Sequence, residues 1–203
     1  MNVYEAATSR RSIRKFKDAP LPYEALEKCV NAGRLAPSGL NRQPCEFLVV
    51  DDEQLLPEVF GSISSWAGQP KPKGTPLTGS EPKAYIVILT RGRQTGAGDN
   101  SGALDFFDAA MAGENIMLVA LEEGIGSCPL RAFRENELRQ LLKVPDTYDI
   151  ALVVAMGYPD ERPVVETTSD TTRRWVDDRG VRHIPKRKLE DILHRNTFQP
   201  QQG

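Results

Sequence analysis

The chain has 203 residues, of which 39% are hydrophobic and 27% are charged, and its formal net charge is −2. This size and composition predict a soluble globular domain with a sizeable core, and the slightly acidic balance excludes a dedicated nucleic-acid binder and gives no attraction to an anionic membrane. We expect neither a secretory signal nor a membrane span, because no charged-then-apolar leader and no run of roughly 20 apolar residues is present.

The first half of the chain predicts alternating helices and strands. A short helix over residues 3–8 is followed by an amphipathic helix that starts after Pro20-Leu21-Pro22 and ends near Leu35. An apolar run at 47–50 predicts a buried strand, and a short helix is expected over 53–60. The scattered cysteines, Cys29, Cys45 and Cys128, form no Cys-x-x-Cys pair. They therefore predict reduced thiols in a cytoplasmic protein, with no disulfide framework and no metal site.

Residues 64–82 contain seven glycines and prolines and have Trp66 near their start. So many helix and strand breakers predict an irregular segment, and a loop of this length in a compact domain is usually functional or mobile. We expect a mobile lid or flap near a pocket. A surface excursion without a role remains the alternative.

The second half predicts a strand over 84–90, a glycine-rich connection over 91–102 and a long helix over 103–123 that ends at Gly124. Asp105, Asp108, Ala112 and Asn115 form the only polar stripe of this helix, so it belongs in a core or in a subunit interface. A short helix over 135–142 and a strand over 150–156 follow. Further strands are expected over 171–176 and 182–184, then a final helix over 186–195 and a frayed tail over 196–203. The pattern favours an α+β fold with helices partly covered by a second subunit.

A basic segment lies near the start of the chain, at Arg10-Arg11-Ser12-Ile13-Arg14. Three guanidinium groups within five positions repel one another unless an anion lies among them, and the planar guanidinium suits phosphate oxygens. If the segment is extended, Arg10, Ser12 and Arg14 share one side. On charge alone, a solvated basic patch is the competing interpretation.

A polar loop follows at Ala36-Pro37-Ser38-Gly39-Leu40-Asn41-Arg42-Gln43-Pro44. Ser38, Asn41 and Gln43 offer neutral donors and acceptors, and Gly39 allows close approach to the backbone. Such a loop could hydrogen-bond a flat heterocycle. Its composition is equally typical of an ordinary helix-to-strand turn.

The two motifs occur together with Gly124-Ile125-Gly126-Ser127-Cys128 and Ala155-Met156-Gly157-Tyr158-Pro159. In this order they resemble the FMN-dependent nitroreductase family, over nearly the whole chain from Tyr4 to Leu193 and most weakly over 61–102. The resemblance implies a single FMN-binding domain over 1–203 with a three-layer α+β sandwich, a mixed central sheet flanked by helices, and an intertwined homodimer with FMN at the subunit interface.

The resemblance also assigns roles to residues. Arg10, Arg11 and Ser12 match phosphate and ribityl contacts, and Arg14 matches the cation at the pyrimidine edge of the flavin. The loop that covers the ring from the other subunit corresponds to Pro37, Ser38, Gly39 and Asn41. The segment along the isoalloxazine face corresponds to Pro129, Leu130 and Arg131, with a backbone N–H near N5, and the basic pair that closes on the phosphate corresponds to Lys186 and Lys188. In many members an aromatic residue stands where this chain has Cys45.

The implied activity is hydride transfer from NADH or NADPH through FMN to a nitroaromatic, quinone or enone, by a ping-pong mechanism without a catalytic acid or base side chain. The histidines, His183 and His194, show no hydrolytic triad pattern, and no Gly-x-Gly-x-x-Gly follows a strand. A specialised relative of the same fold, such as a dehalogenase or a flavin-consuming enzyme, and a non-catalytic flavin-binding or sensing protein remain alternatives. The choice between NADH and NADPH, the acceptor and the direction of the Arg131 side chain stay open.

Overall fold

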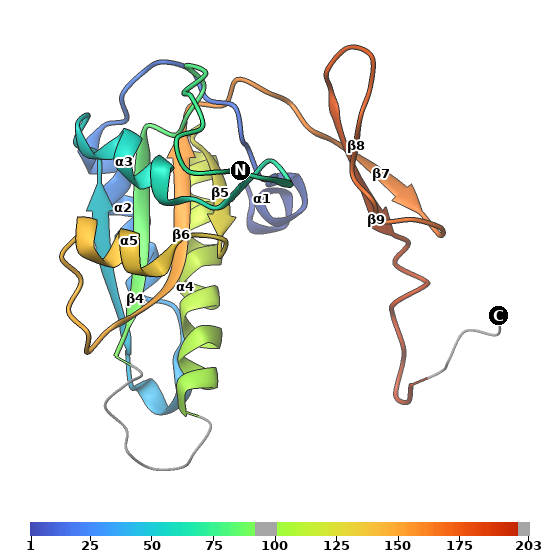
Figure 1. The fold of residues 1–203 in the computed structure, drawn as a ribbon. Coiled ribbons are helices and arrows are strands. Elements are labelled where there is room, and N and C mark those ends of the chain that lie inside the picture. Colours follow the sequence, from blue (N-terminus) through green and yellow to red (C-terminus); the bar gives the residue numbers. More distant parts are fainter. Residues whose placement is uncertain (92–100, 199–203) are drawn as a thin grey trace. The chain divides into compact units, whose positions relative to one another are not determined.

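The computed structural model describes residues 1–91 and 101–198. The chain divides into two compact units, Met1–Asp160 and Glu161–Gly203 (Figure 1). The first unit is built around a central sheet with helices on both faces, and the second contains a small sheet of its own. Residues 92–100, within the expected glycine-rich connection, and 199–203, within the expected frayed tail, lie outside the described residues.

The elements of the first unit follow the predicted order closely. Its helices are α1 (Val3–Ser9), α2 (Tyr23–Arg34), the 3-10 turn η1 (Gly39–Asn41), α3 (Leu55–Ser62), α4 (Ser101–Glu122) and α5 (Glu135–Leu141). Its strands are β1 (Cys45–Val50), β2 (Ser65–Trp66), β3 (Gln69–Pro70), β4 (Ala84–Thr90), β5 (Gly126–Leu130) and β6 (Asp149–Gly157). The strand β5 was not predicted, because Gly126, Ser127 and Pro129 are poor strand formers.

The central sheet has the strand order β1-β4-β6-β5, and its strand pairs are antiparallel. A parallel bridge between Ser12 and Ser127 extends the sheet at its β5 edge, which makes the sheet mixed as expected. The segment that contains the basic motif therefore lies directly beside β5.

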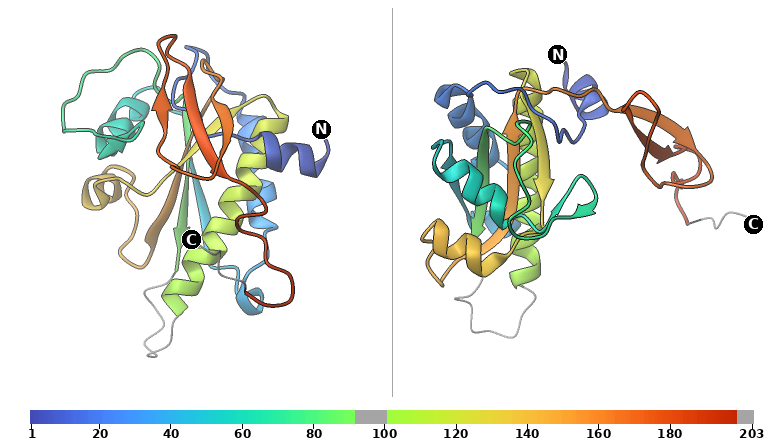
Figure 2. Two further views of the ribbon diagram at one scale, coloured as in Figure 1. Left: turned by 90° about the vertical axis from the view of Figure 1, so that its right-hand side faces the viewer. Right: turned by 45° about the horizontal axis from the view of Figure 1, so that its top comes forward.

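The sheet separates two hydrophobic cores, which gives the predicted three layers. Ile86 and Ile88 of β4 face the core shared with α2 and α4, whereas Tyr85 and Val87 face the core shared with α3 and α5. All seven residues of β4 are buried, as expected for a strand covered on both faces. The left view of Figure 2 shows the sheet edge-on between these helix pairs.

Helix α4 is buried along one side and exposes large apolar residues along the other. Ile116 and Ala120 are fully buried, whereas Phe107 is 66% exposed. Gly124 closes the turn that follows the helix; its φ of 72° is the left-handed conformation that favours glycine, and Ile125 donates its backbone N–H to the Ala120 carbonyl at 2.8 Å. Among the described side chains of this helix, Leu104, Phe106 and Met111 are further large apolar residues that are exposed.

The segment 64–82 contains more structure than its composition suggests. A short hairpin, β2–β3, forms within it, and the turn between the strands uses Ala67 and Gly68 with positive φ. Buried Lys71 anchors the segment by donating its Nζ to the Phe60 carbonyl at 2.8 Å. The expectation of a mobile lid thus stays a prediction for the rest of the segment.

The second unit contains β7 (Val164–Thr168), β8 (Trp175–Val176) and β9 (Arg182–Arg187), in the order β7-β9-β8. The predicted helix over 186–195 is wrong, because Lys186 and Arg187 pair with Thr167 and Thr168 in the sheet and only turns follow. Of the predicted strand over 171–176, only Trp175–Val176 forms a strand, β8. Strand β7 was missed, because Thr and Glu interrupt its apolar pattern.

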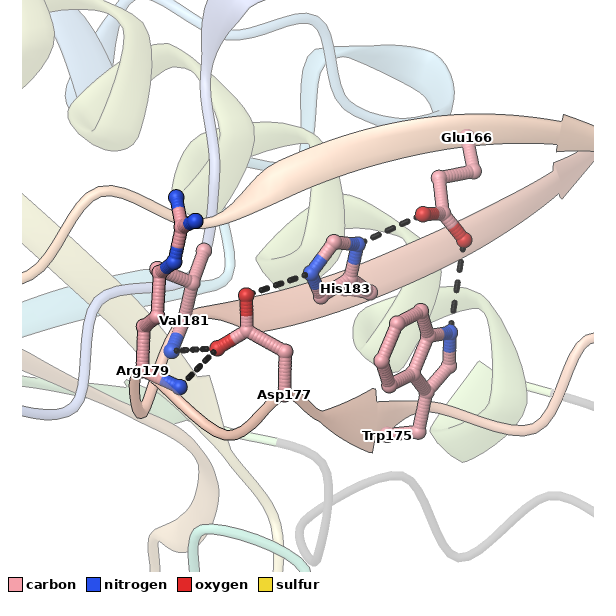
Figure 3. A network of polar contacts seen from close by, with 6 residues as sticks. All are labelled: Glu166, Trp175, Asp177, Arg179, Val181 and His183. Carbon is pink, nitrogen blue, oxygen red and sulfur yellow. Dashed lines mark hydrogen bonds and ion pairs between the residues drawn. The ribbon is translucent and has the colours of Figure 1, made fainter.

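The small sheet of the second unit is held together by a polar network around His183 (Figure 3). His183 Nδ1 lies 2.5 Å from Glu166 Oε1 and its Nε2 lies 3.4 Å from Asp177 Oδ2. The Trp175 ring stacks on the imidazole with 3.9 Å between centroids, and its Nε1 donates to Glu166. These contacts connect all three strands and the turn that follows β8.

Candidate functional site

The basic segment is extended, which is the conformation expected to place Arg10, Ser12 and Arg14 on one side. Ile13 donates its backbone N–H to the Ser127 carbonyl at 2.9 Å, next to the Ser12–Ser127 bridge. The Ile13 side chain is buried over Gly126, where a Cβ atom would come within 2.8 Å of Ile13 Cγ1. Because side chains alternate along an extended chain, Ser12 and Arg14 point away from this contact.

Arg10 has one guanidinium nitrogen in an ion pair and another that lacks a hydrogen-bond partner among the described residues. Its Nε lies 3.2 Å from Glu114 Oε1 on α4, which fixes the guanidinium in place. Its Nη1 is buried and has no hydrogen-bond partner among the described residues. An unpaired buried donor is costly, so an acceptor supplied by a ligand or by a second chain would stabilise this nitrogen.

Arg11 and Arg14 complete the cationic cluster. Arg11 Nη1 donates to the Arg10 carbonyl at 2.5 Å, and Arg14 Nη1 donates to the Ser12 carbonyl at 3.3 Å. Burial, and then the charge of Arg10, lower the pKa of the Arg11 guanidinium below its ordinary value. A bound anion would offset that repulsion and stabilise the cluster.

The predicted flavin-facing segment is the end of β5. Since Ser127 pairs with the basic segment, Pro129, Leu130 and Arg131 continue along the same edge of the sheet. The Leu130 side chain is 8% exposed and belongs to the core under α3 and α5, so only its backbone can serve a ligand. The Arg131 side chain is exposed.

Two acidic side chains of α4, Asp105 and Asp108, bind the polar loop. Asp108 Oδ1 accepts the Gly39 N–H at 3.2 Å, and Asp105 Oδ1 accepts from Arg42 Nη2 at 2.9 Å. Both carboxylates are buried. Pro37, Leu40 and Asn41 are exposed at the surface of the loop, and Ser38 and Gly39 are partly exposed.

Leu40, Asn41 and Gln43 all have positive φ, between 49° and 55°. Such a conformation is costly for residues other than glycine and is kept only where the surroundings impose it. Ser38 supports it by accepting the Gln43 N–H on its Oγ at 3.0 Å. Asp105 and Asp108 therefore fix an irregular loop whose outer face is exposed.

Within one chain, the loop and the basic segment are attached to different parts of α4. The loop is bound by Asp108 and the basic segment by Glu114, six residues further along. Six residues correspond to roughly 9 Å along a helix and roughly 120° around its axis. Figure 1 shows η1 near the lower end of α4 and α1, which leads into the basic segment, near the upper end.

Lys186 and Lys188 belong to the second unit, at the end of β9 and just after it. Both side chains are exposed, and neither makes a hydrogen bond or ion pair with any residue of 1–91 or 101–198. Arg187 differs, because its Nη2 donates to the Asp191 carbonyl at 2.9 Å. The convergence of this lysine pair with Arg10 stays a prediction.

Sequence reasoning missed the residues that support these segments. Asp105 and Asp108 were noticed only as part of a polar stripe, although acids three residues apart on an otherwise apolar helix are a usable signal of a buried polar contact. Glu114 and Ser127 gave no comparable signal. Cys45, at the position of the missing aromatic, packs against the core, and burial, then Asp108 and Asp105, raise the pKa of its thiol to about 11.

The first unit also has an open cleft of about 430 Å³ away from the predicted residues. Asp18, Asp51, Glu53 and Glu81 line it together with Lys83. With four carboxylates and one ammonium group, the lining of this cleft is acidic and unsuitable for a phosphate-bearing ligand. The cleft is therefore not the phosphate site predicted from the sequence motifs. No helix of the described ranges is long and apolar enough to cross a bilayer.

Comparison with known proteins identifies the family. A sequence model described as "Nitroreductase family" matches residues 7–158. A protein of Archaeoglobus fulgidus with the provisional name NADH dehydrogenase/NAD(P)H nitroreductase is 32% identical over 163 residues, which cover 78% of this chain and 86% of that protein. The iodotyrosine deiodinase of Thermotoga neapolitana is 25% identical and covers 78% of this chain and 89% of its own length.

Among solved structures, an FMN-dependent nitroreductase from Clostridium difficile R20291 aligns with a TM-score of 0.69 and 25% identity. The alignment covers 97% of this chain and all of that one. The likeness therefore extends through the second unit as well as the first.

Proposed function

The chain belongs to the nitroreductase family, and on this premise we propose that it is an FMN-dependent oxidoreductase. The proposed reaction takes a hydride from NADH or NADPH and a proton from solvent, and delivers both to a quinone, to an enone or to a nitroaromatic, whose nitro group then loses water. The oxidised nicotinamide leaves before the acceptor binds, in a ping-pong sequence. The NAD(P)H nitroreductase and FMN-dependent nitroreductase names of the relatives support this proposal.

The observation that carries the proposal is the unpartnered nitrogen of Arg10. Its Nη1 is buried within a cluster that also holds Arg11 and Ser12. Phosphate oxygens are strong acceptors that suit a guanidinium, so a phosphate here would satisfy the donor and relieve the repulsion with Arg11. We assign the phosphate and ribityl contacts to these residues and the closing contacts to Lys186 and Lys188.

A homodimer would complete this site. The exposed apolar residues of α4, such as Phe107 and Met111, form a side of the helix that a second copy would bury. In one chain the polar loop is attached to α4 away from the basic segment, so the loop would cover a ring held by the partner. We propose that Pro37, Ser38, Gly39 and Asn41 act across the interface in this way.

FMN supplies the hydride-accepting and hydride-donating chemistry when it is bound. Arg14 would stabilise the negative charge that reduction builds at the pyrimidine edge, because a fixed cation lowers the energy of a developing anion. The backbone at Pro129–Arg131 would orient the ring along β5. No side chain of the chain is assigned a catalytic acid or base role.

Purification followed by reconstitution with FMN tests the proposal. A yellow protein that bleaches with NADH or NADPH and regains its colour with a nitroaromatic or a quinone supports a reductase. Colour without bleaching supports a non-catalytic flavin-binding or sensing protein. A folded, colourless protein that FMN does not reconstitute contradicts both.

A second candidate is a reductive dehalogenase of the same fold. The iodotyrosine deiodinase relative, which aligns over most of both chains, favours it. The two candidates separate when the reduced protein is offered iodotyrosine and a nitroaromatic in parallel. Release of iodide with faster colour return for iodotyrosine would favour the dehalogenase.

A further inference from the structure

We propose that Arg131 is a specificity residue that binds an anionic group, a carboxylate or a phosphate, on the ligand that docks against the flavin. The inference rests on the proposed function, because the flavin places the ligand beside β5. It extends that function by naming the charge of the preferred ligand. The two sources of such a group are an acidic acceptor and the 2′-phosphate of NADPH.

Among the described residues, the side-chain contacts of Arg131 are with two aromatic rings. Its Cζ lies 5.4 Å from the centroid of the Phe106 ring and 5.1 Å from that of Phe133. It makes no hydrogen bond or ion pair with any residue in the described ranges 1–91 and 101–198. The guanidinium therefore lies against aromatic rings, and its five N–H donors have no acceptor among the described residues.

The rings give this cation a defined place. Phe106 comes from α4 and is 41% exposed, and Phe133 is partly buried against the core under α3 and α5. A guanidinium lying over aromatic rings is less hydrated than one in free solution, so it gains more from pairing with a carboxylate or phosphate. The same rings offer apolar surface to the aromatic part of a ligand.

The backbone around Arg131 is fixed against residues at and just before the start of the segment 64–82. Ser64 donates its N–H to the Ala132 carbonyl at 2.9 Å, and Ile63 and Phe133 form an antiparallel bridge. Arg134 Nη1 donates to the Gly61 carbonyl at 2.9 Å. The right view of Figure 2 shows the β2–β3 hairpin that follows these residues standing out from the central sheet.

These contacts bring together two features that are far apart in the sequence, the segment 64–82 and Arg131. The start of the segment 64–82, near Trp66, is paired through Ser64 and the preceding Ile63 with residues 132 and 133, which directly follow the cation at position 131. A ligand lying on the flavin beside β5 would therefore meet a fixed cation, aromatic rings and the base of the hairpin. An aromatic acid fits these groups better than its neutral amide, because only the acid can form a charge-assisted bidentate pair with Arg131.

The first test measures binding without turnover. The oxidised, FMN-loaded protein is titrated with benzoate and with benzamide while the flavin absorbance is followed. Benzoate should bind more tightly than benzamide, and Arg131→Gln should reduce that preference about tenfold, as expected for the loss of one charge-assisted contact. Arg131→Lys should keep part of the preference, because it retains the charge but loses the bidentate geometry.

The second test identifies the source of the anionic group. One arm compares kcat/KM for 4-nitrobenzoate with that for 4-nitrobenzamide, and the other compares NADPH with NADH. A fall of the first ratio in Arg131→Gln assigns the residue to an acidic acceptor, and a fall of the second assigns it to the 2′-phosphate. Arg91→Gln is the matched control, since Arg91 is also exposed and lies 5.8 Å from an aromatic centroid, that of Tyr148.

Ratios unchanged in both arms, together with equal binding of benzoate and benzamide, would overturn the proposal. If Arg131→Gln does not fold, the decision rests on Arg131→Lys and on the wild-type preference for benzoate, whose absence is equally contrary. A protein that binds FMN and is bleached by NAD(P)H but has no charge preference contradicts only this inference. A protein that binds no FMN contradicts the proposed function itself.

Discussion

The buried carboxylate of Asp108 accepts the backbone N–H of Gly39, with distances of 3.2 and 3.3 Å from the amide nitrogen to its two oxygens. This contact connects the N-terminal half of α4 to the loop proposed to cover the flavin. Because a hydrogen bond to a charged, buried acceptor is stronger than one between neutral groups, it fixes the loop more firmly than its glycine and asparagine content suggests.

Replacing Asp108 with leucine should loosen that loop. The Gly39 amide would lose its partner, and FMN affinity should fall about tenfold, which corresponds to the usual cost of one such bond. Hydrogen exchange of the loop amides and an FMN titration measure the two effects. Asp146→Leu is the control, because Asp146 is exposed and distant in sequence from the loop. Unchanged exchange at Gly39 in Asp108→Leu would contradict the assigned contact.

Arg134 should be a main determinant of stability in the first unit. Its guanidinium donates to the carbonyls of Gly61 at 2.9 Å, Ile63 at 3.2 Å and Lys71 at 3.0 Å. Arg134→Ala removes all three donors and should lower the free energy of unfolding by about 2–4 kcal/mol. Urea denaturation measures this change.

The control for Arg134 is Arg34→Ala, which removes an exposed contact to Asn31 at 2.7 Å. It should change the free energy of unfolding by less than about 0.5 kcal/mol. Equal effects of the two substitutions would show that the carbonyl cluster around Arg134 contributes little. A loss of the 64–82 contacts in hydrogen exchange should accompany Arg134→Ala alone.

The second unit should become less stable as the pH rises through the titration of His183 (Figure 3). Burial lowers the pKa of His183, but hydrogen bonds to Glu166 and Asp177 outweigh it, and the net pKa is raised above the ordinary value. A raised pKa in the folded state means that the stabilisation is fully present below about 6.5 and is lost as the pH rises through the folded value.

The carboxylate of Asp177 sets the acidic limit of the pH range in which the small sheet is most stable. A backbone hydrogen bond from Val181, opposed by burial and reinforced by His183, lowers its pKa. Its stabilisation is present above the ordinary carboxylate pKa of about 3.9 and is lost as the pH falls through the lowered value. The small sheet should thus be most stable in mildly acidic solution, between these two titrations.

NMR titration of the imidazole protons measures the His183 pKa, and His194→Gln assigns the signals, since the chain has two histidines. His183→Gln should remove the alkaline loss of order in residues 164–187, as seen by hydrogen exchange. A His183 pKa at or below that of a free histidine, or the same pH profile in His183→Gln, would contradict the network.

The sequence predicted the first unit well because its elements are strongly patterned. The apolar run 84–90 forms β4 with the same limits, and the prediction of a long apolar helix closing at Gly124 is confirmed by α4. Strand β5 could not be predicted, because it is defined by its pairing with β6 and by the bridge to Ser12 rather than by its own residues.

The second unit was predicted poorly for a related reason. Pro185 suggested the start of a helix, but it lies in β9 opposite Glu166, where the parallel pairing with β7 decides the structure. Long-range pairing of this kind leaves no local signal. For the site, the motifs identified the candidate residues themselves, whereas their supports on α4, the buried Asp108 and the half-exposed Glu114, became visible only through their contacts.

Complementation between two defective chains tests the central claim, a flavin site shared between protomers, most directly. One chain carries Arg10→Ala with Ser12→Ala, the other carries Asn41→Asp, and each should retain little FMN as a homodimer. Heterodimers isolated through two different affinity tags should recover FMN in about half of their sites, because one of the two sites then combines an intact basic segment with an intact loop. Heterodimers that retain no more FMN than the parent homodimers would contradict a site shared between chains.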